Sequence, residues 1–330
     1  MNNVDSILDG NRLALSRLLT EVENETSAGS KALDQLFTRS GKAHLIGVTG
    51  APGTGKSSLV NRVAQLIRRE KKLTIAIVAI DPSSPFTGGA ILGDRVRMRD
   101  LSGDPGVFIR SMASRGELGG LARATAGVVQ VLDAAGFDLI MIETVGAGQS
   151  EVDIARLAHT TLVVESPGMG DDIQAIKAGI LEIADILVIN KADRPGVDNT
   201  ERALRANLEL GYSRGTHGKS GHGSFTEKSD NQSGEWIPPV IKTVATEETG
   251  IPEVIRAIND HRVYLKETGL HLLRDRERLQ NEFEHLLRFS LMENWKNSCV
   301  PSRVSAVMEE VFLRKRSPGN AVEELSNRNK

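Results

Sequence analysis

The stretch GVTGAPGTGKSSLV, from Gly47 to Val60, decides how the rest of the chain is interpreted. Inside it, Gly50 to Ser57 match the phosphate-binding pattern G-x-x-x-x-G-K-S/T. The apolar run His44 to Val48 enters the loop as a predicted buried strand. Four apolar residues leave the loop at helical spacing, namely Leu59, Val63, Leu66 and Ile67. A strand before and a helix after are the context that separates a phosphate-binding loop from a glycine-rich turn.

The residue types of this loop suit the phosphate groups of a nucleotide. Glycines let backbone N–H groups close around phosphate oxygens without Cβ clashes, and the following helix directs its positive end at the same anion. The Lys56 ammonium can reach the outer phosphates, and the Ser57 hydroxyl can bind Mg²⁺. The loop residues expected to contact the nucleotide are Gly50, Pro52, Gly53, Thr54, Gly55, Lys56, Ser57 and Ser58.

Composition and charge narrow the class of protein. Of the 330 residues, 39% are hydrophobic and 25% are charged, which is typical of a globular protein in water. The formal net charge of −2 gives no field that would attract nucleic acid or anionic lipid. The sequence contains no apolar run approaching eighteen residues and no signal-peptide pattern. We therefore expect neither a nucleic-acid nor a membrane partner.

Cysteine and histidine usage argues against a metal cluster. Cys299 is the single cysteine, so an intrachain disulfide is excluded, which fits a reducing cytoplasm as the expected location. The seven histidines are scattered along the sequence without an H-E-x-x-H pattern, which argues against a zinc site.

Apolar runs alternate with helical stretches after the phosphate loop. This order predicts an α/β fold with a doubly wound, mostly parallel sheet, which binds ligands at the carboxyl ends of its strands. The expected strands lie at 44–48, 74–81, 107–112, 138–144, 186–193 and 239–245, with one more beginning at 161. Residues 211–234 hold six glycines and five serines, a composition that predicts a flexible insertion.

The segment N-K-A-D, from Asn190 to Asp193, favours GTP over ATP. The Asp193 carboxylate can accept two hydrogen bonds, from guanine N1–H and from the exocyclic amine, and adenine offers no such pair of donors. Lys191 can lie along the base. A four-residue motif alone also fits a turn with a helix cap. The prediction therefore depends on the position of this segment directly after an apolar strand.

Acidic residues at strand ends are candidates for Mg²⁺. Glu143 and Gly146 belong to E-T-V-G, where GTPases usually carry D-x-x-G, and Asp81 and Asp94 are further carboxylates. With Ser57 they form the expected metal set, although an ion pair with a neighbouring arginine is an alternative for Asp94.

The sequence also bears on the rate of hydrolysis. Ala147 stands where Ras-like proteins carry their water-positioning glutamine, so we expect slow intrinsic hydrolysis. Lys177 is a candidate for a compensating positive charge, or a solvated surface lysine.

Together these stretches resemble the MeaB/ArgK-type G-protein chaperones of adenosylcobalamin-dependent acyl-CoA mutases, the group that includes the human methylmalonic aciduria type A protein. The resemblance covers roughly residues 45–195, resumes at WIPPV and continues in the C-terminal helices. Its motifs are GVTGAPGTGKSSLV, DPSSPFTGGAILGDRVRM, SRGELGGLA, ETVGAGQSEVD, SPGMGDDIQAIKAGI and NKAD.

The resemblance implies a Ras-like GTPase domain at 41–265, an N-terminal helical extension at 1–40 and a C-terminal helical dimerisation arm at 266–330. It implies switch segments at 81–97, 143–155 and 166–177, the last with Asp171 and Lys177 as functional residues. The implied activity is GTP hydrolysis coupled to loading, protecting or reactivating a B12 mutase by a homodimer.

Two features depart from the family pattern, and three other functions stay open. The 211–234 insertion is one departure, and Ala245-Thr246-Glu247 in place of the guanine-supporting S-A-x is the other, although Ala245 is still expected at the nucleotide. The alternatives are an ATP-using kinase or transport-accessory protein, a metal-insertion GTPase and a purely structural binding module.

Overall fold

The computed structural model describes residues 3–81, 98–101, 103–113, 120–144, 150–168, 181–213, 235–298 and 300–326. Two compact units make up the chain, one comprising Met1–Leu279 and the other Gln280–Lys330. Among the described residues, no helix combines the length and the apolar character that crossing a bilayer requires.

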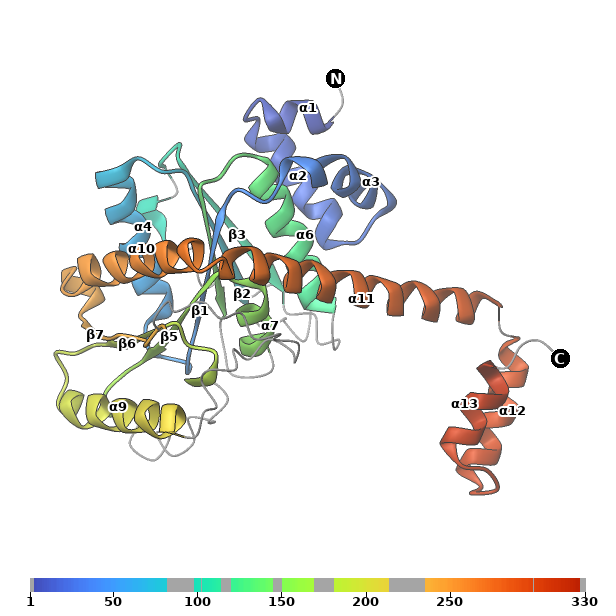
Figure 1. Ribbon diagram of the computed structural model, residues 1–330. Coiled ribbons are helices and arrows are strands. Elements are labelled where there is room, and N and C mark those ends of the chain that lie inside the picture. Colours follow the sequence, from blue (N-terminus) through green and yellow to red (C-terminus); the bar gives the residue numbers. More distant parts are fainter. Residues whose placement is uncertain are drawn as a thin grey trace. The chain divides into compact units, whose positions relative to one another are not determined.

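A seven-stranded sheet with the order β3-β2-β4-β1-β5-β6-β7 forms the centre of the first unit (Figure 1). All six strand pairings are parallel, which confirms the predicted doubly wound α/β fold. Every residue of the middle strands is buried, as expected where helices cover both faces of a parallel sheet. The strands are β1 (His44–Thr49), β2 (Ile75–Asp81), β3 (Val107–Ala113), β4 (Leu139–Thr144), β5 (Thr160–Glu165), β6 (Ile186–Asn190) and β7 (Val240–Thr243).

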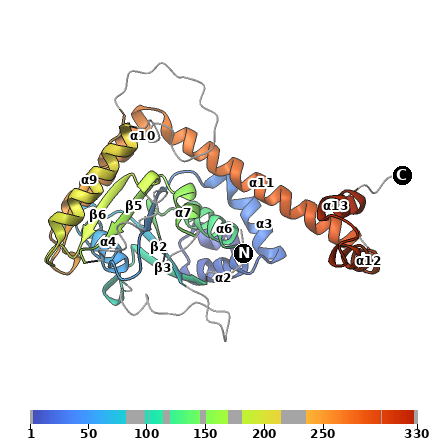
Figure 2. The same cartoon turned by 90° about the horizontal axis from the view of Figure 1, so that it is seen from below.

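Helices α4 (Lys56–Lys71) and α10 (Ile251–Glu267) pack on one face of the sheet, against alternate strand residues such as Ile46 and Val48. The intervening residues, such as Leu45, point to the other face. That face packs against α2 (Arg12–Glu23), α3 (Ser27–Leu36), α6 (Gly120–Ala134) and α7 (Ser150–Leu157). Helix α9 (Val197–Ser213) covers the same face beside β6, as Figure 2 shows. Helix α9 continues to Ser213, into the first residues of the predicted 211–234 insertion, and residues 214–234 lie outside the described part of the chain.

The N-terminal region is helical, as predicted, with α1 (Asn3–Leu8), α2, α3 and the short helix η1 (Phe37–Arg39). Side chains of Asn11 and Thr26 cap α2 and α3 by accepting hydrogen bonds from backbone N–H groups. Leu15, Leu18 and Leu19 are buried in the core that α2 shares with α3, α6 and the sheet, but Leu13 is 62% exposed. Leu13 points away from this core because it lies two residues before Leu15, which corresponds to a rotation of about 200° around the helix.

The C-terminal region is also helical, with α11 (Leu270–Ser298), α12 (Pro301–Phe312) and α13 (Pro318–Ser326). In the second unit, Val307, Ala321 and Leu325 form a small core against Trp295, whose indole N–H donates to the Leu325 carbonyl at 3.1 Å. None of the residues of α11 is fully buried in the single chain.

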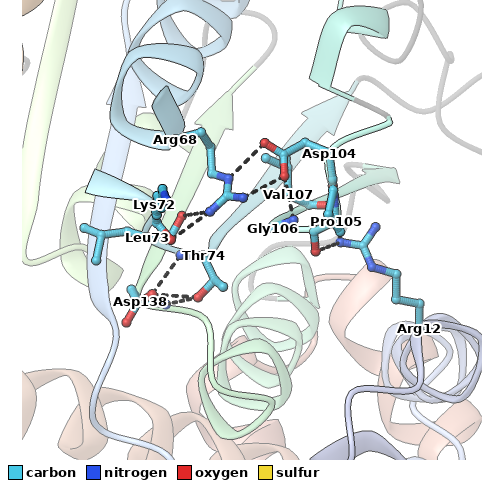
Figure 3. A network of polar contacts seen from close by, with 10 residues as sticks. All are labelled: Arg12, Arg68, Lys72, Leu73, Thr74, Asp104, Pro105, Gly106, Val107 and Asp138. Atoms are coloured by element: carbon cyan, nitrogen blue, oxygen red, sulfur yellow. Dashed lines mark hydrogen bonds and ion pairs between the residues drawn. The ribbon is translucent and has the colours of Figure 1, made fainter. Parts of the chain in front are cut away.

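A polar network connects the segments at the amino ends of β2 and β3 (Figure 3). The Arg68 guanidinium donates to both Asp104 carboxylate oxygens, at 2.8 and 2.9 Å, and to the carbonyls of Lys72 and Leu73 at 2.8 Å each. The Arg12 guanidinium also donates to three backbone carbonyls of this region, those of Asp104 (3.5 Å), Pro105 (2.6 Å) and Val107 (2.7 Å). The network therefore links the N-terminal helices and α4 to an edge of the sheet, on the side away from the phosphate loop.

Candidate nucleotide site

The phosphate loop runs from the end of β1 to the start of α4, at the carboxyl edge of the sheet. Gly50, Gly53 and Gly55 have φ values of 138°, 81° and 91°, a region that residues with a side chain rarely adopt. A Cβ on Gly50 would lie 2.1 Å from the Val164 carbonyl oxygen, and one on Gly55 would lie 2.4 Å from Asn190 Nδ2. The curvature of the loop therefore requires glycine at these two positions.

Two loop residues that the sequence assigns to phosphate and Mg²⁺ lie at the base of this loop. Lys56 Nζ donates to the carbonyls of Gly50 (2.7 Å) and Ala51 (3.0 Å). Ser57 Oγ donates to Glu143 Oε1 at 2.5 Å, a contact that is possible because Glu143 pairs with Val48 of β1 in the sheet. All three of these side chains, those of Lys56, Ser57 and Glu143, are buried, and the hydrogen bonds just given hold their polar atoms at the loop.

Three of the four residues predicted for Mg²⁺ can be placed. Ser57 and Glu143 are in contact, and Asp81 is buried at the end of β2, the strand beside β4. A hydroxyl and two carboxylates are oxygen ligands of the kind that Mg²⁺ prefers, so this group fits the metal chemically.

The predicted base-binding segment is attached to the phosphate loop. The buried Asn190 side chain donates to the Thr54 carbonyl at 2.9 Å and accepts from Thr243 Oγ1 and from the Ala245 N–H at 3.2 Å each. Lys191 Nζ donates to the Gly53 carbonyl at 2.5 Å. Asp193 is exposed in the turn that follows β6. Residues over 130 positions apart are thus brought to one edge of the sheet.

Several predicted positions lie outside the described residues: Asp94, Gly146, Asp171 and Lys177, with most of the three expected switch segments. Within the described part, Pro52 and Ser58 are exposed beside the loop, Thr54 is buried in it, and Ala245 is buried in η3 (Ala245–Glu247).

Sequence reasoning missed two polar residues here. Thr243, at the end of β7, orients Asn190 through its hydroxyl, and no local pattern marks it. Glu165 is buried at the end of β5, the strand next to β1. The sequence could have indicated Glu165, because it is an acidic residue at the end of an apolar strand, like Asp81.

Comparison with known proteins identifies the group to which this chain belongs. The family model described as "Methylmalonyl Co-A mutase-associated GTPase MeaB" matches residues 15–299. The chain belongs to the MeaB family. It is therefore a GTPase that binds nucleotide through its phosphate loop, and the resemblance inferred from the motifs is confirmed.

Relatives of this MeaB-family GTPase include a protein of Pyrococcus horikoshii that also carries a GTPase name. The two are 44% identical over 291 residues, which is 87% of this chain and 86% of the relative. The "GTPase ArgK" of Escherichia coli is 36% identical over 271 residues, 81% of this chain and 77% of the relative. The crystal structure of a protein named "LAO/AO transport system kinase" has a TM-score of 0.67 and 25% identity, covering 98% of this chain and 95% of that one.

Proposed function

We propose that this protein is a Mg²⁺-dependent GTPase that serves as chaperone of an adenosylcobalamin-dependent acyl-CoA mutase. The observation that carries the proposal is the match of residues 15–299 to a family named for association with methylmalonyl-CoA mutase. A fold that binds nucleotide does not by itself define an output, so the output resides in contacts with the partner. The nucleotide bound to the GTPase would control the loading, protection or reactivation of the mutase.

The site residues would have separate tasks. The Lys56 ammonium, which donates to carbonyls of its own loop, would bind the outer phosphate oxygens of GTP. Ser57, Asp81 and Glu143, together with Asp94, would hold Mg²⁺, which neutralises charge that develops on the phosphates. Asp171 and Lys177 would complete the site from the third switch segment, because Ala147 cannot position water as glutamine does.

The second candidate is an ATP-using kinase, favoured by the similarity in fold to the protein named as a transport system kinase. Asp193 separates the two functions, because its carboxylate suits the two donors of guanine and would stay unpaired against adenine. We expect ATP to displace labelled GDP at least about a hundredfold less well than GTP does. The variant Asp193→Asn should lose most of the affinity for GTP, and Asp198→Asn, an exposed acid five residues later, should not. Equal competition by ATP and GTP would contradict the guanine assignment.

The partner is tested by co-purification. The chain is immobilised with GDP, with a non-hydrolysable GTP analogue or without nucleotide, and incubated with a purified adenosylcobalamin-dependent acyl-CoA mutase. We expect the mutase to be retained in one nucleotide state more than in the other, and the difference to disappear for Lys56→Ala. Absence of retention in every state would reject the chaperone function and leave the GTPase activity unaffected.

The organisation proposed for the chain is an N-terminal extension at 1–40, a GTPase domain at 41–265 and a C-terminal arm at 266–330. We also propose that the protein acts in the cytoplasm as a homodimer joined through its C-terminal helices. Exposed apolar side chains along α11, including Phe283 and Leu291, support the dimer, because water-exposed apolar stripes favour association.

A further inference from the structure

Gly47, in the middle of β1, has a helix packed directly on it. A Cβ at this position would lie 2.7 Å from Ile154 Cγ2 and 3.1 Å from Ala158 Cβ. Both distances are shorter than the roughly 3.5 to 4.0 Å at which carbon atoms make their best contact. Ile154 belongs to α7, and Ala158 directly follows that helix. The missing side chain of Gly47 therefore lets α7 lie closer to β1 than any other residue would allow.

The sheet side of this contact cannot give way. β1 is a central strand, and Gly47 pairs with Ile142 of β4 on one side and with Thr161 of β5 on the other. The Ile154 methyl group is also held, because a β-branched side chain on a helix has one strongly preferred rotamer. An added methyl group at Gly47 must therefore displace α7 itself, by about 1 Å if Ile154 Cγ2 is to reach an ordinary contact distance.

One end of α7 is attached to β1, so the displacement is unequal along the helix. The His159 N–H donates to the Leu45 carbonyl at 2.8 Å, and the Leu45 N–H donates to His159 Nδ1 at 3.0 Å. At a rise of about 1.5 Å per residue, Ile154 lies roughly 7.5 Å from this attachment and Ser150, the first residue of α7, roughly 13.5 Å. If α7 pivots about its attached end, a shift of about 1 Å at Ile154 becomes about 1.8 Å at Ser150.

The other end of α7 points toward the phosphate loop. Because α7 crosses Gly47 and ends beside Leu45, its first residue lies toward the carboxyl edge of the sheet, where that loop begins. β4, which carries Glu143, ends at Thr144 on the same edge, and α7 begins at Ser150. Helix α7 thus makes up much of the proposed 143–155 switch segment, so its position on β1 sets the position of that part of the segment.

We propose that Gly47 is a positioning residue for GTP hydrolysis. By letting α7 lie directly on β1, it holds this part of the switch segment at the distance from the phosphate loop that hydrolysis requires. The inference rests on the proposed function of residues 143–155 as a switch. Gly47 precedes the Gly50–Ser57 loop and does not belong to it, so binding of the phosphates does not depend on α7. Gly47→Ala should therefore separate hydrolysis from nucleotide affinity.

The test measures both quantities on the full chain. Single-turnover hydrolysis of GTP in Mg²⁺, with the chain in excess, gives the rate constant, and titration with a fluorescent GDP analogue gives the affinity. We expect Gly47→Ala to lower the rate constant by more than about tenfold, because a misplacement of about 1 Å can cost that much. The affinity should change by less than about threefold.

Gly29→Ala is the matched control. Its Cβ would lie 2.7 Å from the Glu21 carbonyl oxygen, the same distance as at Gly47, but in a contact between α3 and α2. It should lower the Tm and leave the hydrolysis rate unchanged, because α7 takes no part in this contact.

Ile154→Ala tests the contact from the helix side. It removes atoms instead of adding them, which keeps the proposal testable if Gly47→Ala does not fold, and it should slow hydrolysis by more than about threefold. The double variant Gly47→Ala/Ile154→Ala lacks the colliding methyl group and should hydrolyse GTP faster than Gly47→Ala does.

Two results would overturn the proposal. One is hydrolysis at the wild-type rate by folded Gly47→Ala, or by Ile154→Ala if the first variant does not fold. The other is a loss of affinity for the GDP analogue as large as the loss of rate, because the substitution would then act on the phosphate loop itself. The Mg²⁺ dependence of the wild-type rate tests the proposed function separately.

Discussion

At the scale of single residues, the phosphate loop depends on glycines that no other residue can replace. The Gly55→Ala variant adds a methyl group where Asn190 Nδ2 lies 2.4 Å away, at a φ of 91°. The strain of this backbone conformation, roughly 1 to 2 kcal/mol, adds to the displacement of Asn190 from the loop. We expect affinity for a fluorescent GDP analogue to fall by more than about tenfold, as measured by titration.

Gly53→Ala is the matched control for Gly55→Ala. Its φ of 81° is also positive, but its Cβ would have no neighbour within 4 Å among the described residues. It should therefore show the backbone strain without the clash and bind more tightly than Gly55→Ala. The reverse order would mean that contact with Asn190 does not shape the site.

Many residues of the candidate nucleotide site could be named from the sequence, because its motifs are local. The spacing in Gly50–Ser57, the acid Glu143 at a strand end and the N-K-A-D segment each carry their chemistry within a few positions. Thr243 could not be predicted, because only the pairing of β6 with β7 brings it beside Asn190.

At the scale of elements, the Arg68–Asp104 pair links α4 to the start of β3. The hydrogen bonds from Arg68 and from the Gly106 N–H hold the pKa of Asp104 below its usual value. A depressed carboxyl pKa stabilises the fold above the unfolded pKa of about 4, and this contribution is lost as the pH falls through the folded value. We expect Asp104→Asn to lower the free energy of unfolding by about 1 to 2 kcal/mol at pH 7.

The difference between wild type and Asp104→Asn should shrink as the pH is lowered from 5 to 3, measured by urea unfolding. The exposed Asp100 is the control, and Asp100→Asn should change little at any of these pH values. A constant difference across the range would show that lost packing, rather than the charge, explains the effect.

The first turns of α11 are attached to the sheet by an ion pair that the sequence pattern did not reveal. Arg274 donates to both oxygens of Asp185, at 2.8 and 3.0 Å. Although burial alone would raise it, the Arg274 guanidinium and the hydrogen bonds from Arg274 and His261 hold the pKa of Asp185 well below its usual range. Arg274→Ala would leave this buried carboxylate without its guanidinium, so we expect a loss of about 3 kcal/mol in unfolding free energy.

Arg276 is the control for this pair, because it lies on the same helix and is exposed. Arg276→Ala should change stability by less than about 0.5 kcal/mol in the same denaturant titration. The apolar periodicity of α11 predicted a helix, and the helix is confirmed. Periodicity does not indicate which charged residues of that helix contact the sheet, because such ion pairs join segments about 90 positions apart.

At the scale of the whole molecule, the order of strands and helices followed from the sequence, because each apolar run in a parallel sheet is buried on both faces and is therefore easy to recognise. What covers α11 did not follow, because an exposed apolar stripe has the same pattern whether a second copy or another protein packs on it. Phe283, Leu287 and Leu291 are 65%, 46% and 59% exposed, and steps of four residues place them along one side of the helix.

The proposed homodimer predicts that this side of α11 is covered by a second copy of the chain. Phe283→Asp would place a charge in the interface, where no partner compensates its desolvation. We therefore expect the dissociation constant of the dimer to rise by more than about tenfold. Asn281→Asp introduces the same charge about 160° around the helix and should leave the dimer unchanged. Light scattering coupled to gel filtration measures the mass of both. A monomeric wild type, or a dimer that Phe283→Asp leaves intact, would assign the apolar side to a different partner. Repeating the mutase co-purification with Phe283→Asp would then show whether that partner is the mutase.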